Sequence, residues 1–209
     1  HILRIGSTGN DPSALLDARQ RSVDQIADLL PIREVTRENG SIGLMTTNGV
    51  TLLGSKASVL SFERTPTIVA DMTFASGALG GISIDGVPVS SSTGIGRLDG
   101  GALGASFAMR DQTLVEAQTE LDNLAGDLIA RFQDPLNDPT LGAGNIGLLT
   151  DEGGVLDPSD LSGLAGRIEV NTAIVPAQGG NVFLVRDGLG ALAAGPAGDP
   201  AQLNRLLDG

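Results

Sequence analysis

Apolar residues recur at helical spacing near the start of the chain. Asn10 or Asp11 can cap a helix here, and Pro12 fits the first turn, where its missing N–H is not needed. The pattern stops at Pro31, because proline cannot continue a helix. The sequence predicts a first helix over 15–30. Its apolar positions are Leu15, Leu16, Val23, Ile26, Leu29 and Leu30.

The apolar pattern changes to period two after Pro31. Asn39-Gly40, Asn48-Gly49 and Asp85-Gly86 separate short alternating runs, and Asx-Gly pairs favour hairpins because both positions tolerate positive φ. Residues 90–101 are rich in Ser and Gly, which is typical of an exit loop. We expect about seven short antiparallel strands, joined locally. The candidates are 32–37, 42–45, 50–53, 57–62, 67–74, Ile82/Ile84 and Val87/Val89.

Residues 102–133 contain no Pro and carry an apolar stripe with a heptad repeat. Such a helix is roughly 48 Å long, and a narrow heptad stripe requires a partner helix. We expect the helix over 15–30 to be one partner, and further partners to lie outside this fragment. The stripe consists of Leu103, Phe107, Leu114, Ala117, Leu121, Leu124, Leu128 and Phe132.

The chain becomes rich in loops after Pro135. We expect a short helix at 158–166 capped by Asp157, extended segments at 168–175 and 181–185, and a final helix at 200–207 capped by Asp199.

These elements predict an α+β fold: a long-helix bundle domain with an inserted antiparallel β-rich domain. The bundle domain is discontinuous, formed by 1–31 and 101–209, with a loop-rich tail. The inserted β domain spans 32–100, and its two ends can lie side by side near Pro31 and Gly101.

Composition removes several classes of chemistry. The 209 residues include no Cys, Trp or Tyr, and one His, His1. Disulfides, thiolate or imidazole metal sites, and Cys- or His-based catalysis therefore lack their central residue. Carboxylate-only chemistry survives this exclusion. We predict no enzyme, and no catalytic, cofactor-binding or metal-binding residues.

The net charge of −12 is unevenly distributed. Residues 101–209 contain five Arg against fifteen acidic residues, so this half holds −10 of the total. Neither nucleic acid nor an anionic membrane is an expected partner. The acidic half fits either plain solubility or a face that meets a basic neighbour.

Targeting signals are not evident in the sequence. No segment approaches the about 20 unbroken apolar residues of a membrane span, and no signal-peptide pattern opens the chain. Because it begins at His1 without Met, we expect a fragment of a longer protein.

Two motifs suggest ligand binding but fit loops better. Residues 142–147 match GxGxxG. A dinucleotide-binding loop needs a strand before it and a helix after it, and the sequence predicts neither here. The cluster of Asp151, Glu152, Asp157 and Asp160 lacks EF-hand spacing, so we interpret it as a solvated loop containing one helix cap.

Two further patterns have simpler explanations. Glu116, Glu120 and Asp127 lie on the long helix, but a carbohydrate cleft usually adds aromatic platforms, and we interpret them as a solvated face. Asn39-Gly40-Ser41 matches a glycosylation sequon and is explained by the hairpin turn.

Three blocks resemble the family of flagellar hook-associated protein 1. Residues 10–20 resemble the family's NDLLDQRD helix, and 164–171 resemble its A-x-R-I-x-V-N stretch. The central block resembles GG-x-LGA-…-RD-x-x-L-x-x-x-Q-x-x-LD-x-LA. Its matching residues are Gly100, Gly101, Leu103, Gly104, Ala105, Arg110, Asp111, Leu114, Gln118, Leu121, Asp122, Leu124 and Ala125.

This resemblance implies a non-catalytic structural subunit that joins hook and filament. It implies export through the flagellar secretion channel without a cleaved signal peptide, hence a secreted protein of the bacterial flagellum. The implied partners are further copies in a ring, the hook protein, the second junction protein, and an export chaperone that binds the missing C-terminal region. The alternatives are another flagellar axial protein (flagellin, hook or second junction protein) or a Ca-binding surface module.

Overall fold

The computed structural model describes residues 11–90 and 94–208. The chain divides into two compact units: unit 1 is His1–Val115 and unit 2 is Glu116–Gly209. Both contain helices and small antiparallel sheets, which confirms the mixed helix and strand content expected from the sequence.

The first helix, α2, spans Ser13–Leu29. The carboxylate of Asp11 accepts a hydrogen bond from the Ser13 N–H at 3.0 Å, as expected for an Asx residue at a helix start. Asn10, the other predicted cap, lies outside the described residues. Leu30 is already extended, with ψ of 142°, because a proline at the next position disfavours the helical conformation.

Six short strands of unit 1 form two three-stranded antiparallel sheets. The first contains β1 (Ile32–Thr36), β2 (Ile42–Thr46) and β3 (Thr51–Leu53). The second contains β4 (Leu60–Phe62), β5 (Ile82–Ile84) and β6 (Val87–Pro88).

The strand predicted at 67–74 was wrong, because this segment forms consecutive turns. Polar groups of this segment form hydrogen bonds with near neighbours in the chain. The Thr73 N–H donates to the Ser76 hydroxyl, and the Ser76 N–H donates to the Thr73 hydroxyl. Side-chain hydrogen bonds of this kind compete with strand pairing.

The three Asx-Gly turns connect strands as predicted, but they differ in conformation. Both residues of Asp85-Gly86 have positive φ, 49° and 82°. At the other two turns only the glycines, Gly40 and Gly49, have positive φ. The Gly40 N–H donates to the Arg37 carbonyl oxygen and the Gly49 N–H to that of Thr46, and these hydrogen bonds close the turns. The longer hairpin loops therefore need one left-handed residue each.

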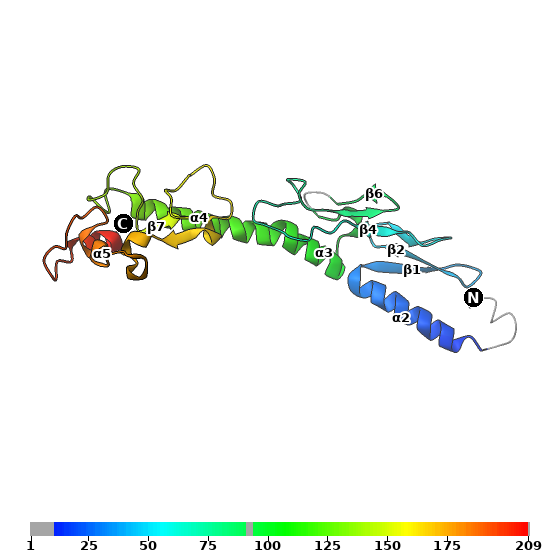
Figure 1. Cartoon of the computed structure of the whole chain (residues 1–209). Helices are drawn as coiled ribbons and strands as arrows, with labels where there is room; N and C mark the ends of the chain where they lie inside the picture. The colour runs from blue at the N-terminus through cyan, green and yellow to red at the C-terminus, as the bar shows by residue number, and fades with distance from the viewer. Residues whose placement is uncertain (1–10, 91–93, 209) are drawn as a thin grey trace. The chain divides into compact units, whose positions relative to one another are not determined.

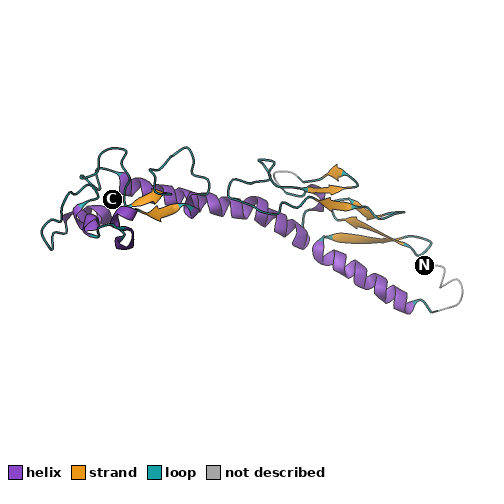
Figure 2. Cartoon of the chain, viewed as in Figure 1, coloured by secondary structure: helices purple, strands orange, loops and turns teal. Residues whose placement is uncertain are grey.

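One hydrophobic core serves all of unit 1. α2 lies along the strands (Figure 2) and contributes Val23. The segment predicted as an exit loop contributes Ile95 and Leu98, both fully buried, through the short 3-10 helix η1 (Gly96–Leu98). Residues 91–93 of that segment lie outside the described part. The buried members of the core are Val23, Leu30, Leu44, Leu52, Ile82, Ile95, Leu98 and Phe107.

The ends of segment 32–100 meet, as the sequence suggested. A Cβ placed on Gly100 would lie 2.9 Å from the Pro31 ring, and one on Gly101 would lie 2.6 Å from the Leu29 carbonyl oxygen. The chain thus leaves α2 and enters the next helix at one point.

The long helical segment has three parts. α3 spans Gly101–Ala108, η2 is a π-helical turn at Met109–Thr113, and α4 spans Leu114–Gln133. Helical structure was predicted for nearly this whole range, but the π turn was not. It belongs to unit 1 and changes which side of the helix the stripe occupies.

Unit 2 is built around the rest of α4. The two-stranded ribbon of β7 (Leu149–Asp151) and β8 (Ile168–Val170) runs beside this helix (Figure 1). Ala125, Ile129 and Leu164 form the buried core, and Leu149 and Ile168 pack against it. Three 3-10 helices also occur: η3 (Leu164–Gly166), η4 (Thr172–Ile174) and η5 (Pro176–Gln178).

The predictions for this tail had mixed outcomes. The predicted helix at 158–166 was wrong, since only the last turn, η3, is helical. The predicted extended segment at 181–185 was also wrong: α5 spans Phe183–Asp187. The final helix is confirmed as α6, Ala201–Asp208, and the Asp199 carboxylate accepts the Ala201 N–H at 3.0 Å.

Candidate interaction surfaces

The leucine repeat of α4 lies on the surface. We call Leu114, Ala117, Leu121 and Leu124, which are exposed, together with the half-buried Leu128, the outer leucine stripe. Leu114, Leu121 and Leu124 are 57%, 54% and 56% exposed, whereas Ala125 and Ile129 in the same helix are buried. The expectation that this whole stripe packs on the 15–30 helix is therefore wrong; only α3 contributes, through Phe107, to the core that contains Val23.

The π turn explains the change of face. Phe107 and Leu114 are seven residues apart, and in a regular helix such positions differ by only about 20°. Yet Phe107 is 8% exposed and Leu114 is 57% exposed. A π turn holds an extra residue, which rotates everything after it by roughly 100°. It therefore places Leu114 on a different face of the helix from Phe107, outside the hydrophobic core.

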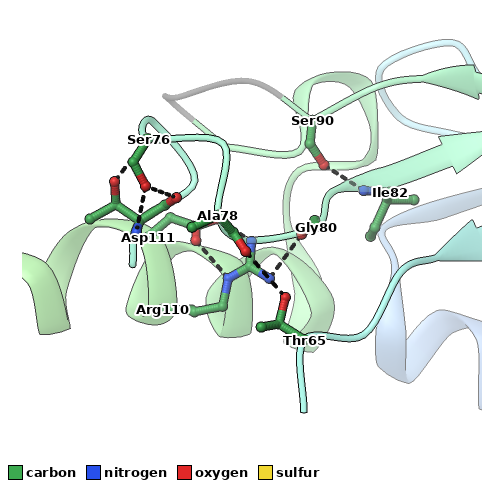
Figure 3. A network of polar contacts seen from close by, with 9 residues as sticks. Thr65, Ser76, Ala78, Gly80, Ile82, Ser90, Arg110 and Asp111 are labelled. Atoms are coloured by element: carbon green, nitrogen blue, oxygen red, sulfur yellow. Dashed lines mark hydrogen bonds and ion pairs between the residues drawn. The ribbon is translucent and has the colours of Figure 1, made fainter. Parts of the chain in front are cut away.

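Arg110 anchors the π turn to the β segment. Its guanidinium forms a two-point ion pair with Asp111, at 2.6 and 2.9 Å, and donates to the Gly80 carbonyl oxygen at 3.1 Å (Figure 3). The Asp111 side chain is only 3% exposed. A buried carboxylate is costly without its cation, so the pair fixes the turn where the helix changes phase.

Two phenylalanines hold the same guanidinium from other sides. It lies 4.6 Å from the Phe107 ring centre and 5.9 Å from that of Phe62, and the two rings meet edge to face at 5.8 Å. Cation–π contact and ring packing thus join η2, α3 and β4. The Arg-Asp pair was noted in the sequence, but its aromatic partners are far away along the chain.

Asp122 connects α4 to the 3-10 helix η3 of unit 2. Its buried carboxylate accepts hydrogen bonds from the N–H groups of Gly163 and Ala165, both at 2.8 Å, and from the Gln118 amide. Burial raises the pKa of this carboxyl, but the hydrogen bonds from Ala165, Gly163 and Gln118 outweigh it and hold the pKa below its usual value. Asp122 therefore acts as a structural cap for η3.

The GxGxxG pattern forms a loop, as interpreted from the sequence. It follows turns and leads into β7, with no helix after it. A Cβ on Gly147 would lie 2.1 Å from the Phe132 carbonyl oxygen, and the Gly147 carbonyl accepts the Asn171 amide at 2.8 Å. This glycine serves the close approach of two backbone segments.

The acidic residues at 151–160 act separately. Asp151 forms a two-point ion pair with Arg167, at 2.8 and 3.1 Å, and those hydrogen bonds raise the pKa of Arg167. Asp157 instead accepts the Ser159 N–H at 2.9 Å. Within residues 11–90 and 94–208, no group of three or more His, Cys, Asp or Glu is placed to hold a metal ion.

The other polar candidates also have local roles. Glu116 and Glu120 are exposed on α4, and Asp127 pairs with Arg131 one turn away at 2.8 Å. The Asn39 carboxamide oxygen accepts the Ser41 N–H at 3.0 Å inside the hairpin turn. Among the helices that the structure describes, none is long and apolar enough to cross a bilayer.

An exposed heptad stripe is typical of a helix that packs against another helix. Residues 1–145 match the family model described as the flagellar hook-associated protein FlgK helical domain, which is more than half of the chain. The chain belongs to this family. It is thus a structural flagellar protein, linked to flagellum assembly and motility, of an exported family. Neither curated proteins nor solved structures gave a match.

Proposed function

We propose that this chain is a non-catalytic subunit of the junction between the flagellar hook and filament. In this role it assembles with further copies into a ring, between the hook protein and the second junction protein. It is secreted through the flagellar export channel with the help of a chaperone. The family match supports the flagellar part of this proposal.

The outer leucine stripe is the observation that carries the structural role. A surface helix in a soluble monomer normally hides its apolar stripe, and a heptad seam fits the groove of another helix. α4 already buries Ala125 and Ile129 on one side. The stripe is therefore a second apolar seam, left for a helix of the assembled structure.

The proposed domain organisation follows the chain path. Residues 1–31 and 101–209 form a discontinuous axial domain, and 32–100 form an inserted β domain. The contacts of Gly100 with Pro31 and of Gly101 with Leu29 support it, because both ends of the insertion meet at one point.

Complementation tests the proposal. The full-length gene should restore filament attachment and swimming to a strain that lacks its own copy. Leu121→Asp with Leu124→Asp should abolish the rescue, because charges in a seam prevent helix packing. Leu136→Asp is the matched control, since Leu136 is 82% exposed outside the stripe.

Two results would contradict this function. The first is a failure of complementation: either the wild-type gene leaves the filaments detached, or the double variant rescues swimming as well as the Leu136→Asp control does. The second is heat released on calcium titration together with a higher melting temperature, which indicates a calcium-binding module.

A further inference from the structure

Two Asn-Gly pairs occupy similar turns of the sheet β1-β2-β3. Asn39-Gly40 lies between β1 and β2, and Asn48-Gly49 lies between β2 and β3. Both pairs are exposed, and both glycines have positive φ. In each turn the glycine N–H donates to a backbone carbonyl oxygen. The same dipeptide therefore occurs twice in one sheet, with nearly the same backbone, and only the surroundings of the two Asn side chains differ.

An Asn-Gly pair carries its own chemistry. The glycine nitrogen attacks Cγ of the Asn carboxamide, so that a bond from this nitrogen to Cγ forms and the bond from Cγ to Nδ2 breaks. Ammonia leaves with the proton of the glycine N–H, and a five-membered cyclic imide remains. Water then adds to one of the two ring carbonyl carbons and opens the ring, which gives aspartate or isoaspartate. Glycine favours the attack because it has no side chain and its backbone adapts easily.

The carboxamide of Asn39 is hydrogen-bonded in a way that promotes this reaction. Its Oδ1 accepts the Ser41 N–H at 3.0 Å and the Ser41 hydroxyl at 2.7 Å. Attack on Cγ places negative charge on Oδ1. Two donors at these distances stabilise an oxyanion that forms during acyl transfer, and so lower the barrier. Ser41 thus supplies a small oxyanion hole within the turn itself.

Asn48 has no such arrangement. Its side chain acts as a donor, with Nδ2 3.4 Å from the Asp99 carbonyl oxygen. Among the residues that the structure describes, none donates a hydrogen bond to its Oδ1. This contact holds the nitrogen that has to leave and does nothing for the oxygen that becomes charged. Asn48 should therefore react more slowly than Asn39.

We propose that Asn39 is a site of spontaneous modification in the folded chain, where Ser41 promotes its conversion to aspartate or isoaspartate. Either product adds a negative charge next to Glu38 in the sequence. Isoaspartate also inserts a methylene carbon into the main chain, which disturbs the turn that the Gly40 N–H closes. The modification thus weakens the connection between β1 and β2 with time. This inference is independent of the junction role, since it depends on one turn alone.

The third Asx-Gly pair provides a comparison with a carboxylate. Asp85 accepts the Val59 N–H at 2.9 Å. That hydrogen bond, followed by one from the Ser58 hydroxyl, holds the pKa of Asp85 below its ordinary value of 3.8. An ionised carboxylate is a poor electrophile, so Asp85-Gly86 should form the imide more slowly than either Asn pair.

Peptide mapping by mass spectrometry tests the proposal, after incubation at neutral pH in water enriched in heavy oxygen. Each conversion then adds one heavy oxygen to the modified residue. In the folded chain Asn39 should convert severalfold faster than Asn48. In urea the two rates should approach each other, because Ser41 no longer holds Oδ1. Ser41→Ala should slow the conversion of Asn39 severalfold and leave Asn48 unchanged. Ser22→Ala, at an exposed serine of α2, is the matched control and should change neither rate.

Three outcomes would overturn the proposal. One is a folded chain in which Asn48 converts as fast as Asn39. Another is a ratio of the two rates that stays the same in urea, which would mean that the fold has no influence. The third is a Ser41→Ala variant that converts Asn39 at the wild-type rate, with circular dichroism showing that the variant is folded.

Discussion

Gly101 lies directly against Leu29. The φ of Gly101 is +62°, and a Cβ at this position would be 2.6 Å from the Leu29 carbonyl oxygen. Two requirements therefore coincide at one residue: a left-handed backbone and the absence of a side chain. This glycine closes the path that leaves α2, passes through six strands and returns to α3.

Gly101→Ala should reduce the free energy of unfolding by about 3 kcal/mol. Left-handed strain costs about 1–2 kcal/mol, and the clash with backbone atoms adds a similar amount. Gly49→Ala is the control, since Gly49 has φ of +87° but no atom within 4 Å of the added Cβ. Urea unfolding measures both, and equal losses would show that the contact with Leu29 is unimportant.

Asp122→Ala should destabilise unit 2 by about 3 kcal/mol. It leaves the N–H groups of Gly163 and Ala165 without their buried acceptor, and bonds to a charged group are the stronger kind. Asp127→Ala removes an exposed pair and should change stability by less than about 1 kcal/mol. Comparable losses for both would mean that the cap contributes little.

The stability from Asp122 also has a definite pH dependence. Its pKa is lowered in the folded chain from the ordinary 3.8, so the carboxylate stabilises the fold above that value. This contribution disappears as pH falls through the folded-state pKa. The free energies of unfolding of the wild-type and Asp122→Asn proteins should therefore become more alike as the pH falls. Urea denaturation at several pH values between neutral and acid measures this.

The sequence predicted elements with strong local signals. α2 has a proline at each end, and the Asx-Gly pairs define three hairpins, because those residues restrict the backbone wherever they occur. The helical structure within 102–133 and the cap of α6 at Asp199 were also predicted from local signals. The stripe predicted as one seam is interrupted by the π turn, which places Phe107 and Leu114 on different faces.

Features that depend on distant contacts were not predictable. Nothing near Met109 indicates a π turn; the partners that stabilise Arg110 include Gly80 and Phe62, from another part of the chain. The burial of Ile95 and Leu98 depends on strands and helices that surround a segment of loop-like composition.

The outer leucine stripe should contribute little to the stability of the isolated chain. Leu121→Ser and Leu124→Ser should each change the free energy of unfolding by about 0.5 kcal/mol or less, since both side chains are more than half exposed. Ile129→Ala, in the same helix but fully buried, should cost about 3 kcal/mol. Urea denaturation compares the three variants. Large losses at Leu121 would mean that the stripe is already packed.

Asp187 should titrate at unusually low pH. Its hydrogen bonds with Arg186, then that from the Gly195 N–H, lower its pKa to about 2. The pKa of Asp187 is lower in the folded than in the unfolded chain, so the pair stabilises the fold at pH values above the ordinary pKa near 3.8. This contribution is lost as the pH falls through about 2. Carboxyl-carbon NMR measures the midpoint. Arg186→Gln should raise it, whereas Arg205→Gln should leave it unchanged; no rise would contradict the pairing.

Arg110 and Asp111 should behave as one unit in a double-mutant cycle. Arg110→Met should cost about 3 kcal/mol, because the Asp111 side chain, 3% exposed, loses its cation while Gly80 loses a donor. Adding Asp111→Leu should recover part of this loss, since a buried ion pair is replaced by apolar side chains. Urea unfolding of the two single variants and the double variant gives the coupling energy. Additive losses would show that the pair does not act together, and the π turn would then need another explanation for its position.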